Sequence, residues 1–263
     1  MALSPAERLL QELGVTEPKE IDLEAIAYHV GARLRFRPLH GCEARIIGSG
    51  DRAIITVNSN SIPRRNRFSI AHELGHWHHH RGQCLVCRAE EYRPRTASSP
   101  ERVADGYAAD LIMPLYLFRP LARQHGKLTL KTVAALADIF EGSQTATAIR
   151  LVESDHAPAL VVCHGPNGRK WFTRAPSVPE RWFPRDDLDA DSFAFGVLFG
   201  SKPDDTAPRR IGAEAWFDRH EADRFEIHEQ SMRCGPNEVL TLLTMTDQQM
   251  LAEGDDRWLH RRR

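Results

Sequence analysis

Histidine is concentrated in one short stretch of this chain of 263 residues. Of thirteen histidines, five lie between positions 72 and 80, and two of these belong to the stretch His72-Glu73-Leu74-Gly75-His76. In a helix, residues four apart share a face and differ by about 6 Å in height, so His72 and His76 can bind one metal ion. Glu73 is rotated by about 100° and lies beside that ion, where it can take a proton from a water molecule that the ion activates. The pattern predicts a catalytic zinc site; the alternative is a charged, histidine-rich surface helix.

A catalytic zinc ion needs a third protein ligand. His80 follows His76 by four residues, but on a continuous helix it lies about 12 Å from His72 along the axis. The three imidazoles therefore cannot meet at one ion. We expect His80 to be either a polar residue at the end of the helix or a residue that contacts one of the ligand histidines.

Glu101 is the better third ligand. Ser99 and Pro100 predict the start of another helix, on which Glu101 and Asp105 share a face with small residues. We expect Glu101 to bind the zinc ion, as in gluzincins. Asp105 would accept a hydrogen bond from the second nitrogen of a ligand histidine and so fix its tautomer.

Hydrophobic periodicity and turn residues predict an α+β fold with two domains. The helices expected before residue 158 are 4–13, 22–30, 65–81, 99–113, 129–140 and 144–152, and the strands are 32–37, 42–47 and 53–57. Beyond it, short β-like runs lie between Pro, Gly and Asp clusters, at 159–163, 170–174, 193–199 and 238–245. We expect a gluzincin-like peptidase domain at 1–153 and a second, sheet-containing domain at 158–263. The two helices expected within 129–152 resemble a helix-turn-helix motif, although most such helix pairs serve only for packing and do not read DNA.

Two blocks of sequence, Phe68–His76 and Glu101–Pro114, resemble the motifs of the ImmA/IrrE family of bacterial metallopeptidases. The family patterns are F-x-x-A-H-E-L-G-H and E-x-x-A-N-x-F-A-A-x-L-L-M-P. Asp105 stands where the family usually has Asn, and Tyr107 where it has Phe. Residues 133–152 also resemble the helical segment that follows these motifs, so the resemblance spans about 60–152.

The resemblance implies a zinc metalloendopeptidase that cleaves a partner repressor of the helix-turn-helix (XRE) type. Cleavage would release genes for the DNA-damage or stress response, mobile-element transfer or phage defence. In defence islands such a peptidase is paired with its repressor. In longer members the C-terminal region is a GAF-like sensor domain, so residues 158–263 are expected to be GAF-like and mixed α/β.

Composition excludes several other classes of protein. The chain is 41% hydrophobic and 27% charged, with a net charge of −1, so it is neither disordered nor a polycation that coats nucleic acid. The chain contains no run of eighteen apolar residues, so no membrane span is predicted. The first residues lack the pattern of a secretory signal. We therefore expect a cytoplasmic protein without a membrane partner. Five cysteines, an odd and sparse set, agree with this.

Cys84 and Cys87 form a C-x-x-C pair in the expected loop after the histidines. A structural zinc site would need a second pair, and a redox pair would need a βαβ context. Two interpretations stay open. They are free thiols in a loop, or one of them is an inhibitory zinc ligand that excludes water, a cysteine switch.

Residues 31–67 hold eight arginines against Glu43 and Asp51. This local excess of positive charge fits either a solvated strand face or a surface for an acidic partner or nucleic acid. Arg64, Arg65 and Arg67 are the candidate nucleic-acid residues, with single-stranded DNA as an activator.

The residue that would stabilise the transition state has no sequence signature. Four residues qualify by type alone: Tyr92, Tyr107, His125 and Arg150. Two competing functions also remain, a non-catalytic zinc-stabilised DNA-binding or antirepressor protein and a small-molecule metallohydrolase. The presence of Glu73 favours a peptidase over the non-catalytic regulator, because a purely structural zinc site does not need this carboxylate.

Overall fold

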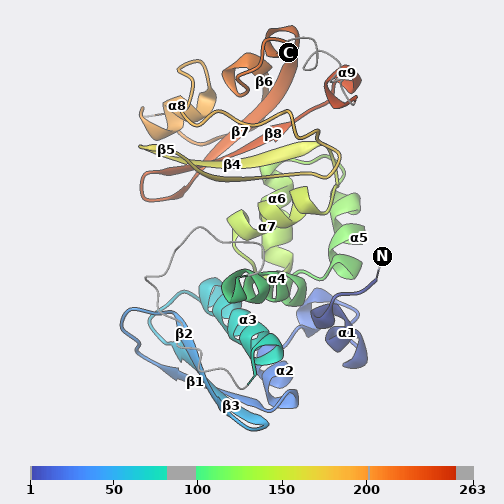
Figure 1. Ribbon diagram of the computed structural model, residues 1–263, viewed down its shortest axis with the longest axis vertical. Coiled ribbons are helices and arrows are strands. Elements are labelled where there is room, and N and C mark those ends of the chain that lie inside the picture. Colours follow the sequence, from blue (N-terminus) through green and yellow to red (C-terminus); the bar gives the residue numbers. More distant parts are fainter. Residues whose placement is uncertain (1, 82–98, 201, 253–263) are drawn as a thin grey trace, which may run out of the picture. The chain divides into compact units, whose positions relative to one another are not determined.

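The computed structural model describes residues 2–81, 99–200 and 202–252. Helices and two separate sheets make up the described chain, which confirms the expected α+β class (Figure 1). Within these residues, no helix combines the length and the apolar character needed to cross a bilayer.

The chain divides into two compact units. The first comprises the chain up to Gln124 together with Ala135–Thr147, and the second comprises His125–Ala134 and the chain from Ala148 onward. Two helices, α6 (Leu130–Ile139) and α7 (Gln144–Glu153), contribute residues to both units.

The first unit contains a small mixed sheet. It is built from β1 (Ala32–Arg37), β2 (Ala44–Ser49) and β3 (Arg52–Asn58) in the order β1-β3-β2. The central strand β3 pairs in parallel with β1 and antiparallel with β2. Along β3 the residues alternate between buried and partly exposed, so one face of this sheet is available for packing against a helix.

Five helices belong wholly or almost wholly to the first unit, and the expected helices start close to where the sequence predicts. They are α1 (Pro5–Glu12), α2 (Leu23–His29), α3 (Pro63–His79), α4 (Pro100–Ile112) and α5 (Leu115–His125), with a 3₁₀ turn at Pro18–Glu20. Ser4 and Ser99 are N-caps followed by proline, as predicted. Helix α3 starts two residues earlier than expected, at Pro63.

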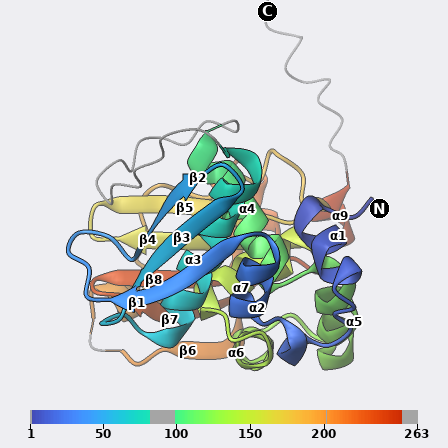
Figure 2. The same ribbon diagram turned by 90° about the horizontal axis from the view of Figure 1, so that it is seen from below.

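Helix α3 packs on the sheet of the first unit (Figure 2). Trp77 anchors it: its indole Nε1 donates a hydrogen bond to the Val30 carbonyl at 2.8 Å. Its ring lies against Gly48 of β2, where a Cβ atom would come within 2.5 Å of the ring. The sheet and the end of α2 thus hold the C-terminal part of α3 in a fixed position.

Helix α1 is tied to the start of α5 by a buried carboxylate. Glu7 closes a capping box with Ser4 and also accepts a hydrogen bond of 2.6 Å from the backbone N–H of Leu115. Close by, the Tyr116 hydroxyl donates to the Val15 carbonyl at 2.8 Å. Segments about one hundred residues apart in the sequence are therefore joined within the first unit.

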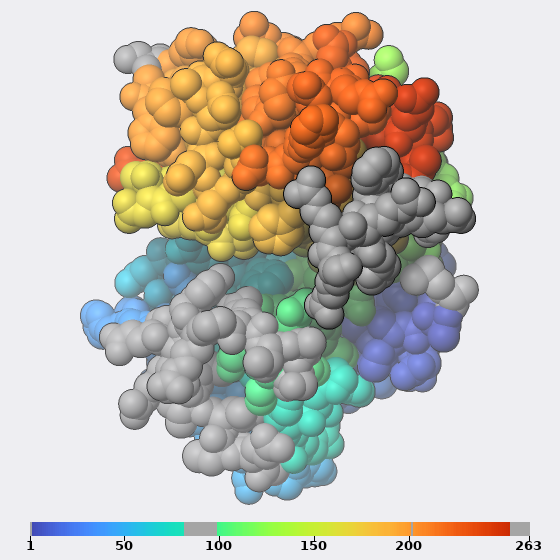
Figure 3. Space-filling model, turned by 45° about the horizontal axis from the view of Figure 1, so that its top comes forward, coloured from blue at the N-terminus to red at the C-terminus, as the bar shows by residue number. Residues whose placement is uncertain are grey.

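The second unit is built on an antiparallel sheet with the order β5-β4-β8-β7-β6. All seven residues of β4 are buried. Its strands are β4 (Ala159–Gly165), β5 (Gly168–Arg174), β6 (Asp205–Gly212), β7 (Glu226–Gly235) and β8 (Glu238–Thr244), and its short helices are α8 (Phe193–Leu198), α9 (Gln248–Leu251) and 3₁₀ turns at Ala213–Ala215 and Ala222–Arg224. In the space-filling view, its surface is formed by residues coloured yellow to red (Figure 3).

One sequence prediction is wrong here, and three elements of the structure were not predicted. The run at 193–199, expected to be a strand, is helix α8, because the Ser192 hydroxyl caps it by accepting a hydrogen bond from the Phe195 N–H at 3.2 Å. Helix α5 was not expected, since Pro120 lies inside it. Strands β6 and β7 were also not expected, and several of the buried residues of β7 are polar.

Candidate metal centre

Helices α3 and α4 lie side by side because small residues face one another where they meet. Ala71 of α3 and both Ala104 and Ala108 of α4 are fully buried. Gly75 lies directly against the backbone of α4 at Ala104. Since no long side chain separates the two helices at this point, polar residues of α4 can reach the histidines of α3.

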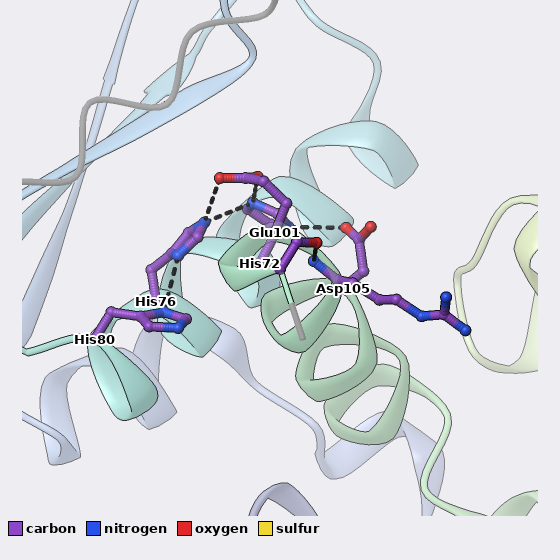
Figure 4. Close-up of polar contacts among 7 residues, drawn as sticks. His72, His76, His80, Glu101 and Asp105 are labelled. Carbon is purple, nitrogen blue, oxygen red and sulfur yellow. Dashed lines mark hydrogen bonds and ion pairs between the residues drawn. The ribbon is translucent and has the colours of Figure 1, made fainter. Parts of the chain in front are cut away.

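Three side chains from these helices converge at one point (Figure 4). The Nε2 atoms of His72 and His76 are 3.0 Å apart. The Glu101 carboxylate spans them, with one oxygen 3.2 Å from Nε2 of His72 and the other 3.4 Å from Nε2 of His76. The structure thus brings together the three residues that the sequence predicts as metal ligands.

These separations suit a zinc ion. Zinc binds imidazole nitrogen and carboxylate oxygen at about 2.0–2.2 Å, so neighbouring ligand atoms around a tetrahedral ion lie about 3.3 Å apart. The three separations of 3.0, 3.2 and 3.4 Å are close to that value. Two imidazoles and one carboxylate also form a donor set typical of catalytic zinc, which leaves a fourth position open.

Asp105 orients His72. One carboxylate oxygen of Asp105 lies 3.0 Å from Nδ1 of His72, so Nδ1 donates the hydrogen bond and Nε2 is left to bind a metal. Burial lowers the pKa of His72, but the hydrogen bond from His72 to Asp105 and the nearby carboxylates of Asp105, Glu73 and Glu101 outweigh it, so the pKa is raised overall. This placement is the one predicted for Asp105.

His76 is held in its neutral form, which is the form that binds metals. Its side chain is completely buried, and burial together with the nearby His72 lowers its pKa to about 4. Its Nδ1 atom lies 3.2 Å from Nδ1 of His80. His80 therefore contacts a ligand histidine rather than the ligand group itself, in agreement with its position on the helix.

Glu73 of α3 is buried, with a relative exposure of 2%. It is adjacent to His72 in the chain, and its negative charge contributes to the raised pKa of that histidine. Its role as the general base stays a prediction.

The candidates for transition-state stabilisation lie in different places. Tyr107 is buried on α4 and stacks on His78, with ring centroids 5.1 Å apart, and burial raises its pKa to about 12. Arg150 is buried on α7 and His125 is the exposed last residue of α5. Tyr92, like Cys84 and Cys87, lies outside the described residues. The role of these residues stays a prediction.

The predicted nucleic-acid residues are engaged in ion pairs. Arg64 contacts Asp138 at 2.6 Å, and Arg65 contacts Glu43 at 3.2 Å. Arg67 lies 3.5 Å from Glu141 and also donates to the Ile21 carbonyl. All three positive charges thus have acidic neighbours, and a nucleic-acid surface at this place stays a prediction.

A second group of metal-ligand side chains lies in the second unit: Cys163, Cys234 and Glu238. Sequence reasoning missed it. The three residues belong to separate strands, so only the register of the sheet brings them together, and no local spacing signals the group.

Comparison with known proteins agrees with this geometry. Residues 27–152 match the model of the Peptidase_M78 family, described as the IrrE N-terminal-like domain. The fold is similar to that of a Mycobacterium tuberculosis transcriptional regulator, with a TM-score of 0.61 and 14% identity over 91% of this chain and 74% of that chain. No curated protein matches the chain. The resemblance seen in the sequence is confirmed, and the segment with both histidines and Glu101 belongs to the ImmA/IrrE family of peptidases.

Proposed function

We propose that this protein is a zinc-dependent endopeptidase that cleaves a partner helix-turn-helix repressor of the XRE type at a specific site. Cleavage would derepress stress, DNA-damage or phage-defence genes. The observation that supports this most is the convergence of His72, His76 and Glu101 within a domain of a peptidase family. A protein of the same fold is named a transcriptional regulator, which is consistent with a regulatory role.

Each residue of the site has a defined task in this proposal. His72, His76 and Glu101 would hold the zinc ion, and Asp105 keeps Nε2 of His72 available by accepting a hydrogen bond from the N–H at Nδ1. Bound zinc would polarise the scissile carbonyl group and lower the pKa of water. Glu73 accepts the proton of the attacking water as general base and then delivers it to the departing amine.

The rest of the chain would regulate this activity. We assign residues 1–153 to the peptidase domain, with the helix-turn-helix-like pair at 129–152, and residues 158–263 to a GAF-like sensor domain. A five-stranded antiparallel sheet with the order β5-β4-β8-β7-β6 forms the framework of this second unit, which is consistent with the sheet-containing domain expected there. Single-stranded DNA is the proposed activator. A repressor substrate places the reaction in the cytoplasm.

The test is cleavage of the repressor encoded beside this gene by the full chain and by Glu73→Gln. We expect the wild type to give two defined fragments by mass spectrometry. Glu73→Gln should retain zinc and fold but cleave about 10²- to 10⁴-fold more slowly, the usual contribution of a general base. Zinc content is measured on both proteins, so loss of the metal and loss of the base are distinguished.

Two outcomes would favour the competing functions. If Glu73→Gln still relieves repression in a reporter assay, the protein acts by contact as a non-catalytic, zinc-stabilised DNA-binding or antirepressor regulator. If the wild type turns over small esters or amides without any protein partner and leaves the repressor intact, it is a small-molecule metallohydrolase.

A further inference from the structure

The sheet of the second unit carries a compact group of sulfur and oxygen atoms. Cys163 lies on β4, Cys234 near the end of β7 and Glu238 at the start of β8. The two Sγ atoms and a carboxylate oxygen of Glu238 all lie within 4.8 Å of one another. Cys163 is buried with 1% exposure, whereas Cys234 and Glu238 are partly exposed.

Strand register explains why these residues meet. Cys163 is paired with Leu240 of β8, and Glu238 precedes Leu240 by two residues, so both side chains belong to the same face of the sheet. The β7–β8 register shifts between Arg233 and Gly235, which leaves Cys234 at an irregularity beside Glu238. Three strands thus direct one ligand atom each to the same place.

The two cysteines are not placed as a disulfide. Their Sγ atoms are 4.0 Å apart, about twice the length of a disulfide bond of roughly 2.05 Å. Because β8 lies between β4 and β7, their backbones are separated by two strand spacings, roughly 9.5 Å. Disulfides normally join Cα atoms no more than about 6.8 Å apart.

The same separation suits a metal ion. Zinc binds thiolate sulfur at about 2.3 Å, which places two sulfur ligands of a tetrahedral ion about 3.8 Å apart. Thiolates select soft and borderline ions, and a carboxylate in the set favours zinc over copper(I). We propose that Cys163, Cys234 and Glu238 bind a thiophilic divalent cation of the zinc type, with a fourth position left for water or another donor.

Charge supports this assignment. Lys170 of β5 forms an ion pair with Glu238 and so holds the carboxylate beside the two sulfur atoms. Two thiolates and one carboxylate carry three negative charges, and a divalent cation with Lys170 supplies three positive ones. The filled site would be neutral, which suits a place where one ligand is buried.

The experiment uses the full chain with Cys84→Ala and Cys87→Ala, so that these two thiols cannot contribute. Cobalt(II) is added and the thiolate-to-cobalt charge-transfer absorption is followed. The ligands His72, His76 and Glu101 contain no sulfur, so this absorption reports only on a thiolate site. We expect it to saturate with one cobalt ion per chain, and the zinc-loaded protein to hold one zinc ion more than Cys163→Ala/Cys234→Ala.

Matched variants separate this site from the peptidase site. Cys163→Ala/Cys234→Ala should lose the absorption, while Cys42→Ala, which removes a free cysteine elsewhere, should keep it. His72→Ala/His76→Ala should lose the other zinc ion and keep the absorption. Failure of the peptidase proposal therefore leaves this test unaffected.

Glu238→Gln is the variant least disruptive to folding, because its side chain is partly exposed. It should weaken cobalt binding at least tenfold in competition with a chelator. The proposal is overturned if the parent chain shows no thiolate absorption, or if Cys163→Ala/Cys234→Ala keeps it. It is also overturned if Glu238→Gln binds cobalt as tightly as the parent, or if the cysteines are found as a disulfide in the non-reduced protein.

Discussion

A Cβ atom at Gly75 of α3 would lie 2.9 Å from both the Cα atom and the carbonyl oxygen of Ala104 in α4. Both are backbone atoms, so no side-chain rotation could relieve the contact, and the helices themselves would have to separate. Since α3 carries His72 and His76 and α4 carries Glu101, the glycine sets the distance between the ligands.

Gly75→Ala should therefore reduce both stability and zinc affinity. In a helix, alanine is more favourable than glycine by up to about 1 kcal/mol because of its higher helix propensity. Overpacking usually costs about 1–3 kcal/mol, and a contact with backbone belongs at the upper end of that range. We expect the free energy of unfolding to fall by about 1–2 kcal/mol in denaturant titrations, and zinc affinity to fall in chelator competition.

Gly106→Ala is the matched control for this change. Gly106 is a glycine in the partner helix α4, where a Cβ atom would have nothing within 4 Å. The substitution should stabilise the protein by up to about 1 kcal/mol and leave zinc affinity unchanged. Equal behaviour of the two variants would show that the spacing of α3 and α4 does not control the site.

Asp105→Asn and Asp105→Ala test the orientation of His72. The amide oxygen of Asn can still accept the hydrogen bond from Nδ1, so we expect a loss of zinc affinity below about tenfold. Alanine removes the acceptor, and loss of such a partner typically costs about 10–100-fold. Equal losses in the two variants would contradict an orienting hydrogen bond. Both are measured by chelator competition at neutral pH.

Asp105 should also set the pH dependence of zinc binding. It raises the pKa of His72 above the usual value of 6.5. As the pH is lowered, protons therefore begin to compete with zinc for His72 at a higher pH than for an ordinary histidine. In Asp105→Asn the negative charge is lost and this pKa falls. The pH at which zinc affinity starts to weaken should therefore move to a lower value, and an unchanged profile would count against the assignment.

Glu101→Ala and His80→Ala compare the two candidates for the third ligand. Glu101→Ala removes a ligand, and we expect the zinc content to fall to background after dialysis. His80→Ala removes only the contact with Nδ1 of His76, so zinc affinity should fall about tenfold and the ion should remain bound in excess zinc. Loss of zinc from His80→Ala and not from Glu101→Ala would reverse the ligand assignment.

The arginines of β1 should contribute more to binding of single-stranded DNA than the ion-paired arginines near the start of α3. Arg33, Arg35 and Arg37 are exposed and form no ion pair within the described chain. The logarithm of the binding constant for an oligonucleotide falls linearly with the logarithm of the salt concentration. Changing all three arginines to Glu should reduce the steepness of this line by about 2, because each lost phosphate contact reduces it by about 0.7.

The matched triple variant changes Arg64, Arg65 and Arg67 to Glu. Its effect on the slope should be smaller, because each of these charges already has an acidic partner. Anisotropy titrations at several salt concentrations measure both slopes. Absence of salt-dependent binding by the wild type would remove single-stranded DNA as an activator.

Local signals in the sequence predict much of the first unit. Serine followed by proline marks the starts of α1 and α4, because the serine caps the helix and proline suits its first turn. The second unit is less predictable. The apolar run at Phe193–Leu198 fits a strand or a helix equally well, and the capping contact of Ser192 selects the helix.

Strand β7 escapes prediction for a different reason. It buries Glu229, Gln230 and Ser231, and their side chains form hydrogen bonds with residues far away in the sequence. Glu229, for example, accepts hydrogen bonds from the N–H of Ala194 and from Nε1 of Trp216. A buried strand of this composition has no hydrophobic alternation.

The two candidate sites show the same contrast. His72 and His76 are four residues apart on one helix, and Glu101 follows a clear helix start, so spacing and motif suffice to select them. Cys163 and Cys234 come together only through the order and register of β4, β8 and β7. Strand pairing across such distances is not encoded in local spacing.

The carboxylate of Glu7 has a practical consequence for anyone who prepares the peptidase part alone. The family match begins at residue 27, yet Glu7 provides the acceptor for the Leu115 N–H, and Val15 provides the acceptor for Tyr116. A recombinant fragment trimmed to the matched region would lose both acceptors, and with them the two hydrogen bonds that tie the start of α5 to the N-terminal segment. Expression boundaries should therefore follow the hydrogen bonds and start before Ser4.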